Sequence, residues 1–306
     1  FSKDKLVIFA GDGTGGFNTQ TSLRTPNKPY SISIGDLNSD GHSDLVVASW
    51  GEDVGAIFDG DGKGGFSEAR NFEVKGRPSS AVVADFNGDQ KLDAAVVQAD
   101  KNSVSIFHGD GAGGVSIAET VQTGSFPRTV ISSDFNRDGH PDLAVNNQID
   151  GTVSLLINQG DGTFRSEILE TGKSPRAMVA YDLNRDKKMD LAVVDGEEHQ
   201  VSVFSGNGKG GFRLSGKFPT GASPRSVIAG DFNGDSLPDL ATANYEGQTV
   251  SLLLGNGKGF FKEVSAFRTG VGPRALASGD FNGDGKEDLA VANWGSSDII
   301  TLIRAE

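Results

Sequence analysis

The chain has 306 residues, no cysteine, 43 glycines, 10 prolines and a formal net charge of -13. The missing cysteines exclude a disulfide-stapled fold, and the glycines follow no Gly-X-Y period, which excludes collagen. The acidic excess argues against a nucleic-acid partner or an anionic membrane surface, and no apolar run approaches the roughly 18 residues of a membrane span.

The first predicted elements are two apolar runs, residues 6–9 and 17–25, on either side of a glycine-rich turn. Six copies of an acidic motif, D-x-N-x-D-x-x-x-D, follow at intervals of 48 or 49 residues, beginning at residues 36, 85, 134, 182, 231 and 280. The chain ends on an apolar run at residues 299–303. A fixed period of this kind indicates an array of similar units.

Each unit contains four apolar runs, A to D, which the fifth copy shows at residues 225–230, 239–244, 249–254 and 260–269. The acidic motif joins A to B. Short runs of Val, Ile, Leu and Phe between Gly, Asn and Asp are typical of strands, and we predict no helix. The Asp-Gly and Asn-Gly turns between C and D predict antiparallel hairpins.

Four strands per unit predict the blade of a β-propeller. The chain begins with C and D and ends with A, B and a C-like run, so a ring would complete a sixth blade from residues 1–25 and 274–306. We therefore predict one all-β domain over residues 1–306, a propeller of six four-stranded blades closed by pairing of N- and C-terminal strands, with seven blades as the alternative. The runs at 6–9 and 299–303 would compete for one position.

The segments D-F-N-G-D-G-K-E-D-L-A-V-A-N at residues 280–293 and G-N-G-K-G-G-F at residues 206–212 resemble the FG-GAP or VCBS repeats of integrin-α-like propellers. The resemblance covers essentially the whole chain. This family includes propeller lectins and bacterial surface proteins, so the resemblance implies a secreted or cell-surface binding protein. Some relatives are catalytic.

The acidic motifs predict Ca²⁺ sites, because Ca²⁺ takes about six to eight oxygen ligands and a tight loop can direct positions 1, 3 and 5 toward one centre. The carbonyl of position 7 and the carboxylate of position 9 would complete the shell. Clustered aspartates also repel one another without a cation. In the alternative interpretation, Asp and Asn only cap the turns.

Up to six Ca²⁺ ions are predicted, mainly in a structural role, with ligands from five positions of each loop. These residues are Asp36, Asn38, Asp40, His42, Asp44, Asp85, Asn87, Asp89, Lys91, Asp93, Asp134, Asn136, Asp138, His140, Asp142, Asp182, Asn184, Asp186, Lys188, Asp190, Asp231, Asn233, Asp235, Leu237, Asp239, Asp280, Asn282, Asp284, Lys286 and Asp288. The fourth loop, residues 182–190, carries Arg185, Lys187 and Lys188, so we expect the weakest site there.

No catalytic residue is predicted. Residues 11–16 match the phosphate-binding pattern G-x-G-x-x-G, but they join strand to strand instead of strand to helix. The motifs of serine hydrolases, zinc proteases and P-loop enzymes are missing from the sequence. An enzyme acting on sugars, such as a lyase or dehydratase, is therefore the least favoured hypothesis.

A ligand surface is predicted at the end of the units opposite the acidic loops. Four A runs begin with Pro-Arg, and three B runs end beside Trp50, Tyr245 or Trp294. Rings can stack on sugars while amides and guanidinium groups bind hydroxyls or carboxylates; alternatively, arginines and rings stack on one another between blades. The candidate residues are Trp50, Asn147, Asn244, Tyr245, Asn293, Trp294, Arg128, Arg176, Arg225 and Arg274.

The leading hypothesis is an extracellular or cell-surface, Ca²⁺-stabilised, monomeric propeller that acts in carbohydrate recognition or adhesion. The alternative is an interaction scaffold within a larger surface protein, with another protein as its partner. The extracellular location follows from the resemblance and from weak loops that need millimolar Ca²⁺.

Overall fold

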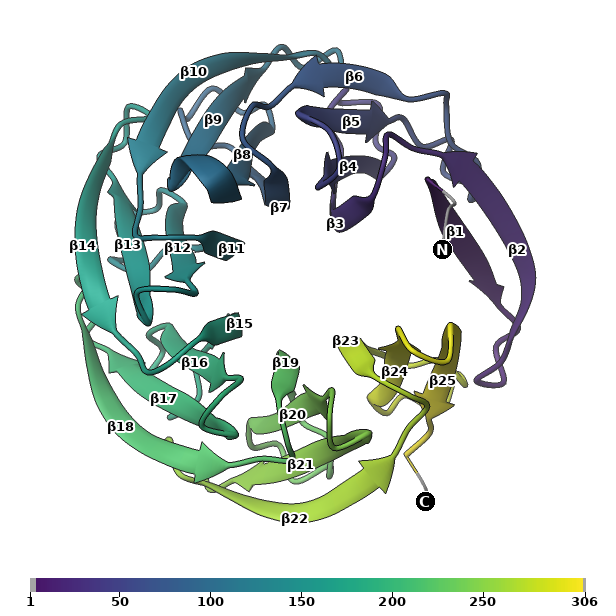
Figure 1. The fold of residues 1–306 in the computed structure, drawn as a ribbon, viewed down its shortest axis with the longest axis vertical. Coiled ribbons are helices and arrows are strands. Elements are labelled where there is room, and N and C mark those ends of the chain that lie inside the picture. Colours follow the sequence, from purple (N-terminus) through teal and green to yellow (C-terminus); the bar gives the residue numbers. More distant parts are fainter. Residues whose placement is uncertain (1–3, 305–306) are drawn as a thin grey trace. The chain divides into compact units, whose positions relative to one another are not determined.

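The computed structural model describes residues 4–304, which form 25 β-strands and one short 3-10 helix, η1 (Ala99–Lys101). The strands make seven antiparallel sheets, each drawn as a separate group of arrows in Figure 1. Apart from the three residues of η1, the predicted all-strand composition is confirmed. No helix in the described residues is long and apolar enough to cross a membrane.

The N-terminal sheet contains β1 (Lys5–Gly11) and β2 (Phe17–Arg24). Three four-stranded blades follow in chain order. Blade I contains β3 (Pro29–Gly35), β4 (Asp44–Ser49), β5 (Val54–Phe58) and β6 (Arg70–Glu73). Blade II contains β7 (Pro78–Ala84), β8 (Asp93–Gln98), β9 (Ser103–Gly109) and β10 (Val115–Gln122). Blade III contains β11 (Pro127–Ser133), β12 (Asp142–Asn147), β13 (Thr152–Asn158) and β14 (Phe164–Glu170).

The C-terminal half repeats the pattern. Blade IV contains β15 (Pro175–Tyr181), β16 (Asp190–Asp195), β17 (Gln200–Gly206) and β18 (Phe212–Pro219). Blade V contains β19 (Pro224–Gly230), β20 (Asp239–Asn244), β21 (Thr249–Gly255) and β22 (Phe261–Arg268). Blade VI has three strands, β23 (Pro273–Gly279), β24 (Asp288–Asn293) and β25 (Asp298–Leu302).

The fold class is therefore an all-β propeller of seven blades, and the prediction of six blades closed by pairing of the terminal strands is wrong. The run at residues 6–9 lies in β1 and pairs with β2, whereas the run at 299–303 contributes to β25, which pairs with β24. The two runs do not compete, because each belongs to its own sheet. The ends of the predicted closing blade, residues 1–3 and 305–306, lie outside the described residues.

A two-stranded sheet can serve as a blade because its apolar side chains have a neighbouring surface to cover. Leu6 of β1 and Leu23 of β2 pack with Leu45, Val47 and Phe58 of blade I. Burying these side chains stabilises the hairpin without the A and B strands that it lacks.

The chain divides into two compact units, one of residues 1–10 and 19–169 and the other of residues 11–18 and 170–306. In the first, apolar clusters lie between adjacent blades: Ile57 of blade I packs with Val96 of blade II, and Ile106 of blade II with Leu143 of blade III. The same arrangement joins blades IV and V and blades V and VI in the second unit. The single domain over residues 1–306 stays a prediction.

In the second unit, the turn at residues 11–18 packs on blade VI. The amide of Gly15 donates to the carbonyl of Phe281 at 2.9 Å, and the hydroxyl of Thr301 donates to the carbonyl of Gly15 at 2.9 Å. The rings of Phe17 and Phe281 meet edge to face at 5.8 Å. These contacts cover the blade that has three strands.

The B strands form the centre of each core. All six residues of β4, β8, β12, β16 and β20 are buried. Strands that are buried on both faces have mostly consecutive apolar residues instead of alternating apolar and polar ones. This pattern made the B strands recognisable in the sequence. Each B strand ends at a polar turn, and that turn forms part of the candidate site.

Every A strand begins with a β-bulge. The register with the B strand shifts at the residue after the initial proline, at Tyr30, Ser79, Arg128, Arg176, Arg225 and Arg274. A bulge leaves one residue outside the ladder and redirects its side chain. The repeated Pro-Arg dipeptides are therefore bulges.

Candidate functional site

The ninth residue of each acidic loop is a buried aspartate that joins three segments of its blade. In blade V, Oδ2 of Asp239 accepts the amide of Phe232 at 3.2 Å, and Oδ1 accepts the amide of Gly255 at 2.8 Å. Asp44, Asp93, Asp142, Asp190 and Asp288 accept equivalent amides seven residues earlier and sixteen residues later. The carboxylate thus holds the acidic loop against the end of strand C, a role that sequence reasoning missed.

Burial makes the charged form of these carboxyls costly. It raises the pKa of Asp142, Asp190 and Asp239 to about 6, although the two backbone amides that each accepts act in the opposite direction. Burial also raises the pKa of Asp93. The charges of the neighbouring aspartates in the loop add to the increase at Asp142, Asp190 and Asp239.

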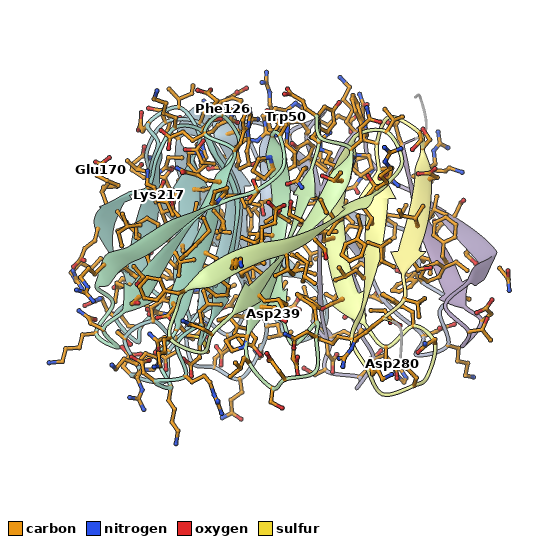
Figure 2. The ribbon with its side chains drawn as sticks, turned by 90° about the horizontal axis from the view of Figure 1, so that it is seen from below. Trp50, Phe126, Glu170, Lys217, Asp239 and Asp280 are labelled. Carbon is orange, nitrogen blue, oxygen red and sulfur yellow. The ribbon has the colours of Figure 1, made fainter. Side chains whose placement is uncertain are left out.

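The first, third and fifth residues of each loop turn their oxygens inward. In the sixth loop, the amide of Asp284 donates to Oδ1 of Asp280 at 3.1 Å and to Oδ1 of Asn282 at 3.0 Å. The amide of Gly285 donates to Oδ2 of Asp280 at 2.8 Å. Asp239 and Asp280 lie toward the same edge of the second unit in Figure 2. The side chains of Asp280 and Asn282 thus hold their own loop together through backbone amides.

The reversal at position 6 does not require glycine. Gly285 has a φ of 80°, and Gln90, Lys187 and Ser236 adopt the same left-handed conformation with φ between 62° and 67°. Residues other than glycine are strained in this conformation. The hydrogen bonds to the first aspartate must therefore stabilise the turn. For example, the amide of Ser236 donates to Asp231 at 2.8 Å.

The chemistry of positions 1, 3 and 5 suits a hard cation, since each loop offers two carboxylates and one amide oxygen. In the first loop the third and fifth side chains converge, with Nδ2 of Asn38 3.0 Å from Oδ2 of Asp40. Within residues 4–304, however, no group of three or more His, Cys, Asp or Glu side chains is arranged to hold a metal ion. The ninth carboxylate is already bonded to two backbone amides. Ca²⁺ binding through positions 1, 3 and 5 stays a prediction.

The fourth loop differs in its charge. Nζ of Lys188 lies 3.0 Å from Oδ2 of Asp186, the fifth-position carboxylate. In the sixth loop the equivalent contact, between Lys286 and Asp284, is longer at 3.8 Å. A cation at the fourth loop would have to compete with the lysine for this oxygen.

At the other end of the blades in the first unit, five side chains form what we call the first rim cluster: Tyr30, Trp50, Arg77, Phe126 and Arg128. The rings of Tyr30 and Trp50 stack at 5.0 Å, and Phe126 meets Trp50 edge to face at 6.1 Å. The guanidinium groups of Arg77 and Arg128 lie 5.0 Å and 4.8 Å from the ring centre of Trp50. Figure 2 shows Trp50 and Phe126 together at the edge of the molecule.

Arg128 also donates a hydrogen bond to the hydroxyl of Tyr30, 98 residues away in the chain. Because both residues sit at β-bulges, their side chains leave the sheets and meet at the rim. Trp50 and Arg128 were predicted from the sequence as ligand residues, whereas Arg77 and Phe126 were not. Their shared position is visible in the sequence, because each stands directly before the proline that begins an A strand. In the structure, Arg77 and Phe126 adopt positive φ angles of 59° and 56°.

The second unit contains a second rim cluster of Arg225, Tyr245, Arg274 and Trp294. Arg225 lies 4.7 Å from the ring centre of Tyr245, and Arg274 lies 5.5 Å from that of Trp294. The two rings are 6.4 Å apart. Trp294 remains 49% exposed. Arg176 lies beside Gly196, which stands where blades I, V and VI have Trp50, Tyr245 and Trp294.

The three asparagines predicted as ligand residues are buried instead of exposed at the rim. Nδ2 of Asn147 donates to Thr152 and Ser154, both at 2.9 Å, and Nδ2 of Asn244 makes the same pair of bonds to Thr249 and Ser251. Nδ2 of Asn293 donates to Asp298 at 2.8 Å. These amides hold the turn between strands B and C, so in this geometry they do not face a ligand.

A polar basin of about 630 Å³ lies beside the first rim cluster, lined by Lys28, Trp50, Gly51, Glu52, Asp53, Arg77 and Asp100. Arg77 forms an ion pair of 3.2 Å with Asp100. Oδ1 of Asp53 accepts the amide of Gly76 at 3.0 Å. The basin therefore combines one indole, two cations and three carboxylates at one surface.

The model of the FG-GAP-like repeat family matches six overlapping segments, residues 1–47, 36–96, 85–145, 134–193, 182–242 and 231–291. Each match after the first begins at the first aspartate of an acidic loop. No protein of curated function matches the chain by sequence.

Solved structures with the same fold have diverse functions. The periplasmic gluconolactonase PpgL of Pseudomonas aeruginosa is 17% identical with a TM-score of 0.69, covering 97% of this chain and 80% of that one. An Agrocybe aegerita lectin that recognises non-reducing terminal N-acetylglucosamine is 15% identical with a TM-score of 0.60, covering 99% and 91%. BBS1N, solved in complex with ARL6DN, is 14% identical with a TM-score of 0.62, covering 96% and 82%. At these identities the likeness shows the fold alone.

Proposed function

This chain belongs to the FG-GAP-like repeat family, and on that premise we propose that it is a carbohydrate-binding propeller whose ligand surface is the polar basin beside the first rim cluster. The fold does not choose among functions, because similar propellers include a lactonase, a lectin and a protein-binding domain. The proposal therefore depends on the chemistry of the basin.

The observation that carries the proposal is the combination of an aromatic ring with both acceptors and donors. Trp50 supplies an apolar surface, Glu52 and Asp53 supply acceptors, and Lys28 and Arg77 supply donors. Sugar hydroxyl groups both donate and accept, while the CH faces of the sugar ring pack on aromatic side chains. The basin volume, about 630 Å³, lies within the range of small-molecule sites.

Binding is better supported than turnover. The ion pair with Arg77 and the amide of Gly76 already engage Asp100 and Asp53, so these carboxylates are fixed as parts of a surface. The basin lining contains no serine, threonine, cysteine or histidine that could act as a nucleophile or general base beside them.

Ca²⁺ enters the proposal as a structural ion. The first, third and fifth residues of each acidic loop would hold it, for example Asp280, Asn282 and Asp284 in blade VI. There it would offset the repulsion between carboxylates and keep the loop between strands A and B ordered. An extracellular or cell-surface location would supply millimolar Ca²⁺ and remains part of the proposal.

The test is a glycan array probed with the protein in millimolar Ca²⁺ and again in chelator. We expect a defined set of glycans to bind in Ca²⁺, with weaker binding in chelator as the loops loosen. In isothermal titration with the best glycan, Trp50→Ala should weaken affinity by about tenfold or more, as truncation of a central aromatic residue usually does.

A matched control is Phe260→Ala, which removes an exposed aromatic side chain from a turn between strands C and D. Its affinity should equal that of the wild type. Undiminished glycan affinity in the triple variant Trp50→Ala, Tyr245→Ala, Trp294→Ala would exclude both rim clusters as the site. If no glycan binds in either condition, the carbohydrate proposal fails and a protein partner becomes the better candidate.

A further inference from the structure

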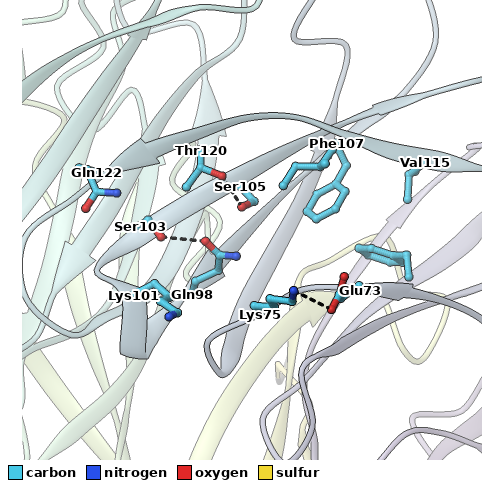
Figure 3. Close-up of a pocket in the computed structure, with 12 residues that line it drawn as sticks. Glu73, Lys75, Gln98, Lys101, Ser103, Ser105, Phe107, Val115, Thr120 and Gln122 are labelled. Atoms are coloured by element: carbon cyan, nitrogen blue, oxygen red, sulfur yellow. Dashed lines mark hydrogen bonds and ion pairs between the residues drawn. The ribbon is translucent and has the colours of Figure 1, made fainter.

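A second cavity, which shares no lining residue with the rim basin, lies in the first unit between blades I and II. It is a groove of about 530 Å³, bounded by β6 on one side and by β9 and β10 on the other (Figure 3). Phe72 and Phe107 meet edge to face at 5.1 Å, and Val115 and Ile117 extend this apolar surface. Its charged and amide groups include Glu73 and Lys75 at and after the end of β6, and Gln98 and Lys101 at and after the end of strand B of blade II.

The repeats provide an internal standard for that turn. In blades III, V and VI, a glycine packs directly on the asparagine that ends strand B. A Cβ atom on Gly124 would lie 2.7 Å from Nδ2 of Asn147, and one on Gly221 would lie 2.6 Å from Nδ2 of Asn244. In these blades the glycine and the asparagine leave no room for a further side chain.

Blade II departs from this standard at three aligned positions. Lys75 stands where Gly124 and Gly221 stand, and Gln98 stands where Asn147 and Asn244 stand. Lys101 occupies the position of Asp150 in blade III and Gly247 in blade V. All three replacements line the groove. The longer side chains therefore coincide with the groove.

Gln98 leaves a hydrogen-bond donor inside the groove. Its side chain is 6% exposed, and its Oε1 accepts the hydroxyl of Ser103 at 2.7 Å. Within residues 4–304, its Nε2 has no hydrogen-bond partner, unlike the amide nitrogens of Asn147 and Asn244. Ser105, whose equivalents in blades III and V accept those amides, instead bonds to Thr120 at 2.9 Å. Figure 3 shows Nε2 of Gln98 turned away from Ser103, toward the middle of the groove.

The charge of the groove is positive in a protein whose net charge is -13. Lys75 and Lys101 contribute two ammonium groups, and Glu73, which pairs with Lys75 at 3.2 Å, contributes the one carboxylate of the lining. The groove is thus lined both by the donors of Lys75, Lys101 and Gln98 and by the rings of Phe72 and Phe107. Nε2 of Gln98 is not one of the fully buried polar atoms, so it reaches the open groove, where a ligand acceptor can bond to it.

We propose that this groove is a binding site for a small organic acid that has a flat or ring-shaped apolar body. The ring would lie against Phe72 and Phe107, and the carboxylate would accept from Nε2 of Gln98 and from the ammonium groups of Lys75 and Lys101. This site is separate from the rim basin, and its occupant does not depend on whether the rim binds carbohydrate.

The probe is benzoate, compared with benzamide, its neutral isostere, and with benzylammonium. Saturation-transfer NMR on the intact protein should show benzoate binding with a Kd on the order of 1 mM, because a ligand of this size has few contacts. Benzoate should also shift the side-chain amide resonance of Gln98. Benzamide should bind at least several-fold more weakly, and benzylammonium should show no saturable binding.

The double variant Lys75→Gly, Gln98→Asn restores the residues of blades III and V, so it should close the groove and reduce benzoate affinity at least tenfold. Lys101→Gln is a second, exposed change that should weaken binding several-fold even if the double variant does not fold. The control is Lys173→Ala, an exposed lysine in the equivalent loop before blade IV, which should leave the affinity unchanged.

Three results would overturn the proposal. The first is equal affinity for benzoate and benzamide, which would remove the carboxylate from recognition. The second is undiminished benzoate binding in both Lys101→Gln and a folded double variant. The third is no saturation transfer from the protein to any of the probes at about 20 mM, well above the Kd expected for a fragment of this size.

Discussion

The amide of Gly255 donates a 2.8 Å hydrogen bond to Oδ1 of Asp239, sixteen residues earlier, while Oδ2 of the same carboxylate accepts the amide of Phe232. One buried side chain therefore ties the acidic loop, the start of strand B and the end of strand C. The same pair of bonds occurs in all six blades that contain an acidic loop.

Replacing Asp239 by alanine should destabilise the protein strongly. Two buried backbone amides would lose their acceptor, and each unsatisfied group costs about 1–3 kcal/mol, so we expect the free energy of unfolding to fall by about 2–6 kcal/mol. Asp239→Asn keeps one acceptor oxygen and should cost less. Urea unfolding measures both. Glu263→Ala, an exposed change on β22, is the control, and an Asp239→Ala loss no larger than this control would contradict the structural role.

Stability without divalent cations should fall as the pH rises. Burial raises the pKa of Asp142, Asp190 and Asp239 from 3.8 to about 6, so the folded protein holds these protons more tightly than the unfolded chain. Their contribution is fully present below about pH 4 and is lost as the pH rises through about 6. Urea unfolding in chelator across this range should show the decrease. Stability that increases with pH there would contradict the assignment.

Removing Ca²⁺ should lower the melting temperature. An ion that binds only the native state adds about 2.7 kcal/mol per site at a hundredfold excess over its Kd, so several occupied loops would contribute a large part of the stability. Differential scanning calorimetry in millimolar Ca²⁺ and in chelator measures the difference. A melt unchanged by chelator would mean that the aspartates only shape the turns. Mg²⁺ at the same concentration is the matched comparison, because it demands a stricter geometry.

The fourth acidic loop should bind Ca²⁺ most weakly, because Lys188 pairs with Asp186 at 3.0 Å. Replacing Lys188 by glutamine would free this carboxylate and should strengthen the site. Anomalous scattering from crystals grown in Ca²⁺ reports the occupancy of each loop. Equal density at all six loops in the wild-type protein would show that the lysine does not weaken binding.

The repeat, the strands and the hairpin turns could be predicted because each depends on residues close together in the chain. Apolar runs bounded by Gly, Asn and Asp become strands, and the C to D turns reverse direction because their glycines adopt positive φ, as Gly208 and Gly257 do. The acidic loops could be located for the same reason. The role of the ninth aspartate could not, since its second partner lies sixteen residues away on another strand.

The surroundings of the candidate ligand residues could not be predicted, because equivalent positions in a repeat can have different neighbours. Trp50 and Arg128 do meet at the rim, but Asn147 and Asn244 are buried in their own blades. The bulge after each A-strand proline redirects one side chain, and the chain pattern does not reveal which distant residue it will contact. The Tyr30 to Arg128 bond joins residues 98 positions apart.

By itself, the sequence determined the strands, their order in each unit and the six acidic loops, because hydrogen bonding and side-chain alternation within a hairpin are local. Only the tertiary structure decided that the terminal runs at 6–9 and 299–303 belong to separate sheets, giving seven blades. It also decided which side chains meet at the rim and where Lys75 and Gln98 leave a groove. These outcomes depend on which surfaces, far apart in the chain, pack together. A periodic sequence has the same local pattern in a propeller of six blades and in one of seven.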